Sequence, residues 1–310
     1  MYKKTFLKDI KLNTNLFKDL WWASRPLSLT LAVYSTTLGA AAAYRQNLIF
    51  QNDYLFDFYL ILLITTAGIA VQTATNLIND FFECEIKYVK YNSQGEKKYY
   101  FLGKYRSAFD VLVFYLGIFC FLITAFIGIH LVYLTTAKLL IVGILGLIGG
   151  YSYTGEPIVY KKRGLGTVLS FILMGPLMVF GSYLVFSRSF SWYPVIIGMP
   201  LSLMIPMLML SNELRDYRRD KKWGIRTMTV RFGYRFSKNI FLFLLILSYL
   251  LVIIYTALGL LPVYSLLTFF TLPLAVKAFK SAAEKSREGV PITNKLHLIF
   301  GLILIVTMFF

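Results

Sequence analysis

Apolar runs of membrane-spanning length recur along the whole chain and are separated by short polar segments. Nine runs are long or apolar enough to predict transmembrane helices. They lie at about 26–50, 57–79, 108–131, 137–154, 165–187, 192–212, 239–259, 262–279 and 296–310. With 57% hydrophobic and only 15% charged residues, the composition is that of a membrane protein. The sequence therefore predicts an all-α fold, a polytopic membrane bundle of about nine transmembrane helices.

The chain begins with a segment that is basic and amphipathic but has no long apolar core. Residues 1–25 also lack the small-residue cleavage site of a signal peptide. We expect this segment to lie on the membrane surface, with Trp21 and Trp22 as interfacial anchors. The remainder, 26–310, is expected to form a single transmembrane domain with active-site loops on the cytoplasmic side at 83–107 and 213–239.

Positive charge is distributed unevenly between the two ends of these helices. Of the 32 Lys and Arg residues, 29 fall in the segments 1–26, 83–107, 154–166, 213–239 and 276–296, and the exceptions are Arg45, Lys138 and Arg188. Because positive loops stay in the cytoplasm, this pattern predicts a cytoplasmic N-terminus. We attribute the net charge of +17 to topology and to attraction by anionic lipid, and we expect no nucleic-acid partner.

A polar stripe closes the second predicted helix. In TATNLINDFFECEIK, residues 73–87, Asn76 and Asp80 are one helical turn apart, and so are Asn79 and Glu83. Polar and ionisable groups at the end of a membrane helix are expensive and usually mark a substrate or ion site.

A second acidic pair follows the sixth predicted helix, where Asp216 and Asp220 stand at i and i+4 and share one face. Two carboxylate clusters at one mouth can hold Mg²⁺, which keeps several waters and takes other ligands from substrate phosphates. Asp80, Asp216 and Asp220 are the candidate catalytic acids. We interpret Glu85, Glu156 and Glu213, taken singly, as solvated side chains at helix ends.

Basic side chains in the same loops could bind the diphosphate that such a metal site implies. Topology explains most of them, and Arg215 and Arg226 are the strongest candidates because each lies inside the spaced acidic motif. The basic residues within reach by position are Lys104, Arg106, Lys161, Lys162, Arg215 and Arg226.

The second acidic motif resembles that of a known enzyme family. The residues Asn212, Arg215, Asp216, Asp220, Gly224, Arg226, Thr227, Val230, Arg231 and Gly233 are similar to the second motif of the UbiA-type intramembrane prenyltransferases, in particular the 1,4-dihydroxy-2-naphthoate polyprenyltransferase branch. The resemblance extends over nearly the whole chain. Supporting matches are Ala23-Ser24-Arg25-Pro26, the segment from Tyr153 to Gly166, and Gly175, Pro176 and Gly181. The first motif differs from the family's Asn-Asp-x-x-Asp, because Glu83 stands at its last position.

This resemblance implies an integral membrane transferase that moves a polyprenyl group from its diphosphate to an aromatic quinone precursor. The implied reaction is a step of menaquinone biosynthesis, and the implied location is a prokaryotic inner membrane. It further implies Mg²⁺ as the cofactor, with Asn79, Asp80, Glu83, Asp216 and Asp220 as metal ligands. The substrate-binding residues it implies, together with the loop positions, are Asn76, Lys104, Tyr153, Lys161, Arg215 and Arg226.

Three alternatives remain open from the sequence. The acceptor could be 4-hydroxybenzoate, a haem precursor or a glycerol phosphate. The chain could be a non-catalytic relative that binds prenyl lipid, or a transporter, although its acids lie at helix ends and not at mid-membrane. His130 and His297 have no spaced ligand partner and do not indicate a histidine metal site.

Overall fold

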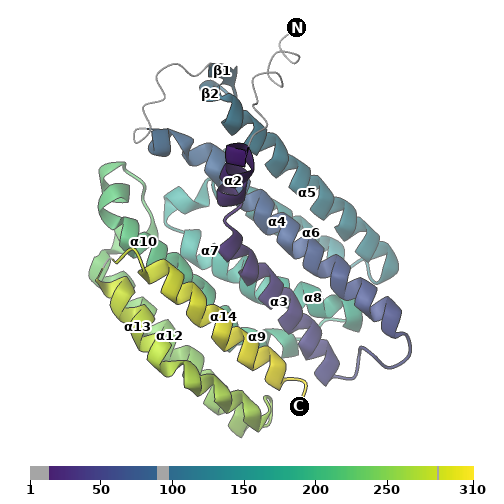
Figure 1. Ribbon diagram of the computed structural model, residues 1–310. Coiled ribbons are helices and arrows are strands. Elements are labelled where there is room, and N and C mark those ends of the chain that lie inside the picture. Colours follow the sequence, from purple (N-terminus) through teal and green to yellow (C-terminus); the bar gives the residue numbers. More distant parts are fainter. Residues whose placement is uncertain (1–13, 89–97, 285) are drawn as a thin grey trace.

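The computed structural model describes residues 14–88, 98–284 and 286–310, and within them the chain is a bundle of long helices (Figure 1). Residues 1–13 of the expected N-terminal segment and 89–97 of the expected loop 83–107 lie outside the described residues. The elements in chain order are α2 Thr14–Ala23, α3 Pro26–Arg45, α4 Tyr54–Tyr88, β1 Lys98–Phe101, β2 Lys104–Ser107, α5 Ala108–Leu134, α6 Leu139–Ser152, η2 Tyr160–Arg163, α7 Gly166–Ile172, η3 Leu173–Leu177, α8 Met178–Ser187, α9 Tyr193–Ser202, α10 Met204–Lys222, α11 Met228–Phe232, α12 Tyr234–Ala257, η4 Val263–Thr271, α13 Leu272–Ala283 and α14 Gly289–Thr307.

Eight helices of the described residues are long and apolar enough to cross a membrane. The predicted helix at 137–154 corresponds to α6, which has 14 residues and is shorter than a usual span. The all-α polytopic fold class is thereby confirmed, and the one small exception is the antiparallel hairpin of β1 and β2.

The largest differences from the predicted spans lie at the polar ends of helices. Helix α4 continues to Tyr88 and α10 to Lys222, well beyond the apolar runs that end at 79 and 212. Helix α14 begins at Gly289 and not at 296, which gives it 19 residues. Hydropathy marks where the apolar surface ends, but backbone hydrogen bonding continues as long as the residues are good helix formers. Both acidic motifs therefore lie on helices, as their i, i+4 spacing predicted.

The core lies where α3, α9, α10, α12, α13 and α14 meet, around Phe241 and Phe300, which are fully buried. Small residues permit close helix contacts. A Cβ atom at Gly39 of α3 would lie 2.4 Å from the carbonyl oxygen of Val179 on α8, and Ser182 Oγ donates to the carbonyl of Thr36 at 2.6 Å. Close approach of backbones at small residues is the usual basis of helix packing in membranes.

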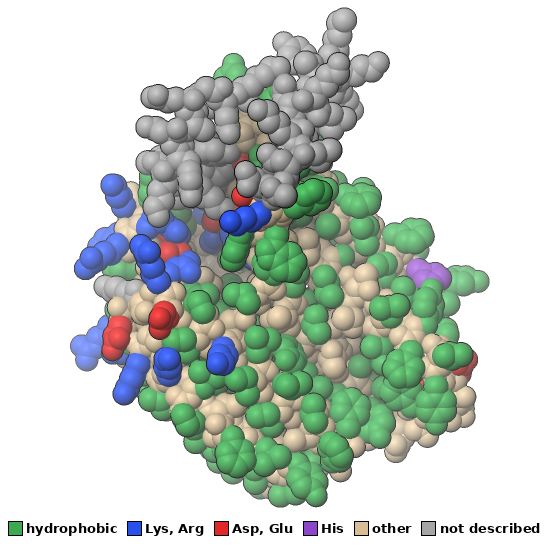
Figure 2. Space-filling model, viewed as in Figure 1, with side chains coloured by type: hydrophobic (Ala, Val, Ile, Leu, Met, Phe, Trp, Pro, Cys, Tyr) green, Lys and Arg blue, Asp and Glu red, His purple; other side chains and the backbone are tan. Residues whose placement is uncertain are grey.

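Charged side chains gather at one end of the molecule. Figure 2 shows Lys and Arg side chains concentrated beside the α10–α11 and α13–α14 connections, while the rest of that face is mostly hydrophobic. At the same end, α2 exposes Phe17, Trp21 and Trp22, whose exposed fractions are 67%, 60% and 63%. Exposed aromatic residues on a short amphipathic helix are typical of a membrane interface. The location of this segment on the membrane surface stays a prediction.

Candidate active site

A cavity of about 510 Å³ opens between α3, α4, α6, η3, α10 and α14, at the charged end of the bundle. Its polar wall contains both acidic motifs: Asp80 and Glu83 from α4, and Asp216 and Asp220 from α10. Its other wall is apolar and includes Val71, Leu173, Met174, Met178, Leu208, Met209 and Val290. Each motif occupies one face of its helix through i, i+4 spacing, and the apolar part of the same helix packs into the bundle. This packing brings the two polar faces to the same cavity.

The backbone of the apolar wall is irregular. Residues Leu173–Leu177 form one turn of π-helix around Pro176, which has no amide hydrogen to donate to the preceding turn. Such π-turns inside longer helices occur frequently at functional sites. Here the irregular turn places Leu173 and Met174 against the cavity.

Arginine side chains hold the carboxylates of α10. Arg215 forms a two-pronged bond with Asp216, from Nε to Oδ1 at 2.9 Å and from Nη2 to Oδ2 at 2.7 Å. Arg219 lies between the two acids and donates to Asp216 Oδ2 at 2.9 Å and to Asp220 Oδ1 at 2.8 Å. The geometry of a guanidinium suits this sharing, because its donors form a planar fork. In the free protein these aspartates are therefore neutralised by residues of their own helix.

Lys161 reaches the α4 motif from η2. Its ammonium group contacts Oε1 of Glu83 directly and lies 5.3 Å from the centre of the Tyr153 ring. Arg25 approaches the other oxygen of Glu83 at 3.9 Å. Burial lowers the pKa of Lys161, but Tyr153 and Glu83 beside it outweigh this effect and leave the pKa above its ordinary value. Lys161 is therefore a fixed cation on the cavity wall.

Two Asn residues brace the polar wall. Asn76 donates from Nδ2 to the carbonyl of Ser24 and to Ser28 Oγ, both at 2.8 Å, so it also ties α4 to the start of α3. Asn79 is buried, and in the amide orientation that satisfies its neighbours its nitrogen donates to Glu83 at 3.2 Å while its oxygen accepts from Arg25 at 2.5 and 2.6 Å. Arg25 has φ of 52°, a left-handed conformation that is rare outside glycine.

The structure places most of the expected site residues at the cavity and leaves two outside it. Asn76, Asp80, Glu83, Tyr153, Lys161, Arg215, Asp216 and Asp220 all line the cavity. Asn79 lies directly behind it, bonded to Glu83. Lys104 on β2 and Arg226 before α11 are exposed and are not among the lining residues, so their roles remain predictions.

Glu213 differs from the sequence interpretation, which had it solvated. One carboxylate oxygen accepts from Thr167 Oγ1 at 2.9 Å, and the other accepts from the backbone nitrogen and hydroxyl of Thr229 at 2.8 and 2.9 Å. Glu213 thus joins α10 to α7 and α11 at the edge of the cavity. The spacing within α10 gave no signal for this role, because both partners are distant in sequence.

Three cavity residues were not selected as site residues from the sequence: Arg25, Arg219 and Asn294. Of these, Arg25 appeared only in a supporting motif. A signal existed for Arg219, which lies three residues after Asp216 on the same helix face. His297 is 1% exposed and lies edge-on to Tyr34, with ring centres 5.4 Å apart, so it is a core residue without an acidic partner among the described side chains.

The chemistry of the donor set fits Mg²⁺ in part. Among the described residues, no three Asp, Glu, His or Cys side chains gather closely enough to hold an ion alone. The cavity nevertheless presents carboxylate oxygens from two helices, and Mg²⁺ is commonly held by one or two carboxylates plus substrate phosphates. The residues therefore fit a magnesium ion that arrives with a phosphorylated substrate.

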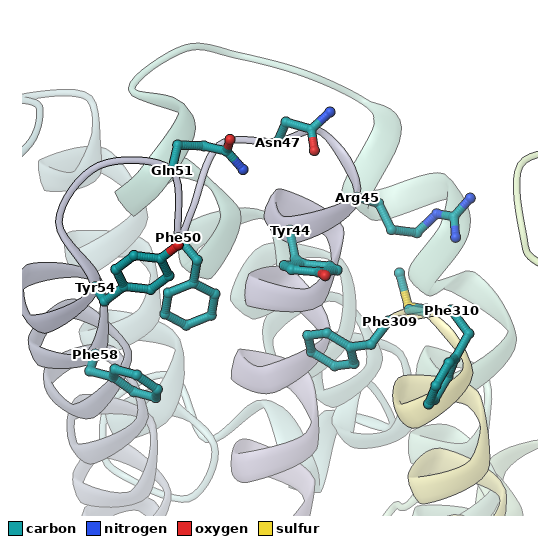
Figure 3. Close-up of a pocket in the computed structure, with 10 residues that line it drawn as sticks. Tyr44, Arg45, Asn47, Phe50, Gln51, Tyr54, Phe58, Phe309 and Phe310 are labelled. Carbon is teal, nitrogen blue, oxygen red and sulfur yellow. The ribbon is translucent and has the colours of Figure 1, made fainter.

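A second cavity, of about 620 Å³, lies at the opposite end of the bundle (Figure 3). Its lining is mostly aromatic, including Tyr44, Phe50, Phe58 and Phe309, with Arg45 as its cation. No carboxylate lines it among the described residues. Because metal-assisted diphosphate chemistry needs acidic oxygen ligands, the cavity that contains both acidic motifs is the candidate active site.

The fold and the cavity define an integral membrane protein whose helices bring two acidic motifs and several cations to one pocket. The sequence pattern of the UbiA prenyltransferase family matches residues 32–299, and the chain belongs to this family. It is therefore a prenyltransferase by family.

Among curated relatives, "UbiA prenyltransferase domain-containing protein 1" of Rattus norvegicus is 30% identical over 285 residues, which cover 90% of this chain and 80% of the relative. The "1,4-dihydroxy-2-naphthoate octaprenyltransferase" of Bacillus subtilis is 22% identical over 293 residues, covering 92% of this chain and 90% of the relative. With one relative from an animal and one from a bacterium, these matches do not support the expected prokaryotic inner membrane.

Among solved structures, a UbiA homolog from Archaeoglobus fulgidus bound to DMAPP and Mg²⁺ superposes with a TM-score of 0.54 at 12% identity, covering 91% of this chain and 97% of that one. At this identity the likeness shows the shared fold alone.

Proposed function

We propose that this protein transfers a polyprenyl group from its diphosphate to an aromatic quinone precursor, most simply 1,4-dihydroxy-2-naphthoate, in a Mg²⁺-dependent reaction. The observation that carries the proposal is that Asp80, Glu83, Asp216 and Asp220, from two helices, line one cavity with Lys161 and three arginines. The printed name of the Bacillus relative supports the naphthoate acceptor, and the Archaeoglobus structure bound to DMAPP and Mg²⁺ supports the donor and the ion.

In this proposal the polar wall binds the diphosphate. Asp80, Asp216 and Asp220 would hold Mg²⁺, which would supply positive charge to the phosphate oxygens of the leaving group. Asn79 and Glu83 complete the proposed ligand set. Arg215 and Arg219, which bond the aspartates in the free protein, turn toward phosphate oxygens, and Lys161 supplies a further positive charge. Fixed cations aimed at developing negative charge stabilise departure of the diphosphate.

The apolar wall has a separate task. Cleavage of the carbon–oxygen bond leaves positive charge on the allylic carbon, and water would capture it. Met174, Met178 and Leu208 surround this part of the cavity and exclude water. The electron-rich ring of the acceptor then attacks the allylic carbon, and with a 1,4-dihydroxy-2-naphthoate acceptor the ring carboxylate leaves as carbon dioxide.

The test is transfer of labelled geranyl diphosphate to 1,4-dihydroxy-2-naphthoate by purified protein in lipid, with and without Mg²⁺. We expect metal-dependent product that falls at least a hundredfold in Asp216→Asn and in Asp220→Asn. Glu284→Gln, which removes an exposed acid at the end of α13, is the matched control and keeps full activity.

Parallel reactions with 4-hydroxybenzoate and with a glycerol phosphate test the acceptor. Product with one of these and none with the naphthoate would replace the acceptor but keep the reaction class. A folded protein that binds geranyl diphosphate yet transfers it to none of them would refute the proposal.

A further inference from the structure

Helix α14 contributes one polar residue to the otherwise apolar wall of the cavity. Val290 and Asn294, at i and i+4, line the cavity from the same face of this helix. Asn294 is only 2% exposed, so its amide is almost completely enclosed by protein.

The side-chain carbonyl oxygen of Asn294 lacks a hydrogen-bond partner among the described residues. This atom, Oδ1, is buried. Other polar side chains around the cavity have partners: Asn76 bonds to Ser24 and Ser28, and Glu213 bonds to Thr229. Burying an amide without partners is unfavourable, particularly within a membrane, so an apolar side chain would be the stable choice at this position. An enclosed amide beside a cavity indicates a ligand that supplies the missing hydrogen bonds.

Neighbouring contacts place Asn294 away from the acidic motifs. At the start of α14, a Cβ atom on Gly289 would lie 3.3 Å from Ser211, and farther along, one on Gly301 would lie 3.0 Å from Leu201. The helix therefore runs antiparallel to α9 and α10, and Asn294 lies near the level of Met207. By the helical rise this is about 13 Å from Asp216 along α10, deeper in the bundle. Asn294 is thus too far inside to bind the diphosphate.

We propose that Asn294 is a specificity residue for the prenyl acceptor, and that its side-chain amide hydrogen-bonds to a ring hydroxyl of a hydroxyarene. The inference rests on the function proposed above. A prenyl tail is pure hydrocarbon and offers an amide no hydrogen bond, whereas a hydroxyl group both donates and accepts. Met174, Met209 and Leu208 supply the apolar surroundings that an aromatic ring requires, and thioether sulfur packs well against ring edges.

The experiment measures acceptor and donor saturation separately in Asn294→Leu, which keeps the volume and removes the amide. With geranyl diphosphate, Mg²⁺ and 1,4-dihydroxy-2-naphthoate, we expect the acceptor KM to rise about tenfold, the loss of one substrate hydrogen bond, while the donor KM stays within twofold. Thermal unfolding is measured on the same protein, and its midpoint should stay equal or rise, because the amide contributes no bond in the free state. Ser237→Ala is the matched control: it removes another buried, unpartnered polar atom, on α12 and outside the cavity lining, and should change neither KM.

Two results would overturn the inference. A donor KM that rises as much as the acceptor KM would assign Asn294 to the prenyl tail or to the shape of the whole cavity. A lowered unfolding midpoint with unchanged KM values would make the residue structural. If the wild-type protein forms no product, the proposed function fails separately, and calorimetric binding of 1,4-dihydroxy-2-naphthoate without donor still tests the residue. Saturable binding that is lost in Asn294→Leu supports the recognition role, and equal binding in both proteins refutes it.

Discussion

The contact between Lys161 and Glu83 allows a quantitative test of how the polar wall is held together. The side chains are 18% and 14% exposed, and Arg25 approaches the same carboxylate at 3.9 Å. Lys161→Met removes one cation from a carboxylate that keeps another. Glu83→Gln removes the carboxylate that separates two cations. The two substitutions break the same contact but leave different charges behind.

Breaking a buried ion pair from one side typically costs about 3–5 kcal/mol, because the remaining charge has no partner. In Lys161→Met, Arg25 still attracts Glu83, by an amount on the order of 4 kcal/mol at 4 Å and an effective dielectric constant of 20. That attraction must be discounted because the Arg25 side chain is 38% exposed. We therefore expect a loss of about 1–2 kcal/mol for Lys161→Met and about 3 kcal/mol for Glu83→Gln.

The double variant decides whether this reasoning is correct. With Lys161 and Glu83 both neutral, Arg25 is the one charge of this group that loses its partner, and its side chain is 38% exposed. The stability of the double variant should therefore equal or exceed that of Glu83→Gln alone, which leaves both Arg25 and Lys161 without the carboxylate. The assay is unfolding followed by tryptophan fluorescence in one defined detergent mixture. Lys162→Met is the control, because Lys162 is exposed, and it should shift the free energy of unfolding by less than about 0.5 kcal/mol. Losses in the double variant equal to the sum of the single losses would show that the pair is not coupled.

The same variants separate two roles of Glu83. If Glu83 binds Mg²⁺, Glu83→Gln raises the Mg²⁺ concentration needed for half-maximal transfer and Lys161→Met does not. If its role is to hold Lys161, both variants lose kcat to a similar degree and the Mg²⁺ requirement is unchanged.

Three further predictions follow from individual contacts. Gly39→Ala should destabilise the protein by about 1–3 kcal/mol because its Cβ would meet a backbone oxygen at 2.4 Å, whereas Gly128→Ala on α5, with no atom within 4 Å, should be neutral or stabilising in the same unfolding assay. Glu213→Gln should lower the free energy of unfolding by about 1–2 kcal/mol, because it weakens the hydrogen bonds to Thr167 and Thr229. The exposed-site control Glu284→Gln should leave the free energy of unfolding unchanged. Equal effects of the two substitutions would contradict the contacts described. Removing Mg²⁺ with EDTA should abolish transfer. It should not lower the thermal unfolding midpoint, because Asp216 is already bonded to arginines of its own helix. A lower midpoint in EDTA would show instead that the protein contains a structural ion.

Local sequence pattern predicted the parts of this protein that depend on one helix at a time. Apolar runs located the helices, and the i, i+4 spacing placed Asp80 and Asp216 on helix faces that meet at one cavity. The pattern failed where an outcome depends on which helices pack together. From the sequence alone Glu213 looks like a solvated acid, and only the positions of Thr167 and Thr229 show that it is half-buried and hydrogen-bonded. Asn294 likewise lies before the predicted apolar run at 296–310, between Thr293 and Lys295, and nothing in its spacing indicates a cavity.

Hydropathy also misjudged helix ends for a physical reason that bears on function. The acids that we propose as catalytic lie in helical extensions beyond the apolar runs, in α4 after residue 79 and in α10 after residue 212. A helix that continues past its apolar stretch fixes the direction of each carboxylate, which a loop would leave variable. In α10 the helical extension also places Asp216 and Asp220 beside Arg215 and Arg219, so these two carboxylates are neutralised before substrate binds. Arg215 and Arg219 have two alternative partners of the same geometry, aspartate oxygens and phosphate oxygens. An arriving magnesium diphosphate complex supplies both the cation that the aspartates lose and the anion that the arginines gain. The ion alone would leave the arginines without an anion, and the diphosphate alone would leave the aspartates without a cation. We therefore propose that the ion and the diphosphate bind together.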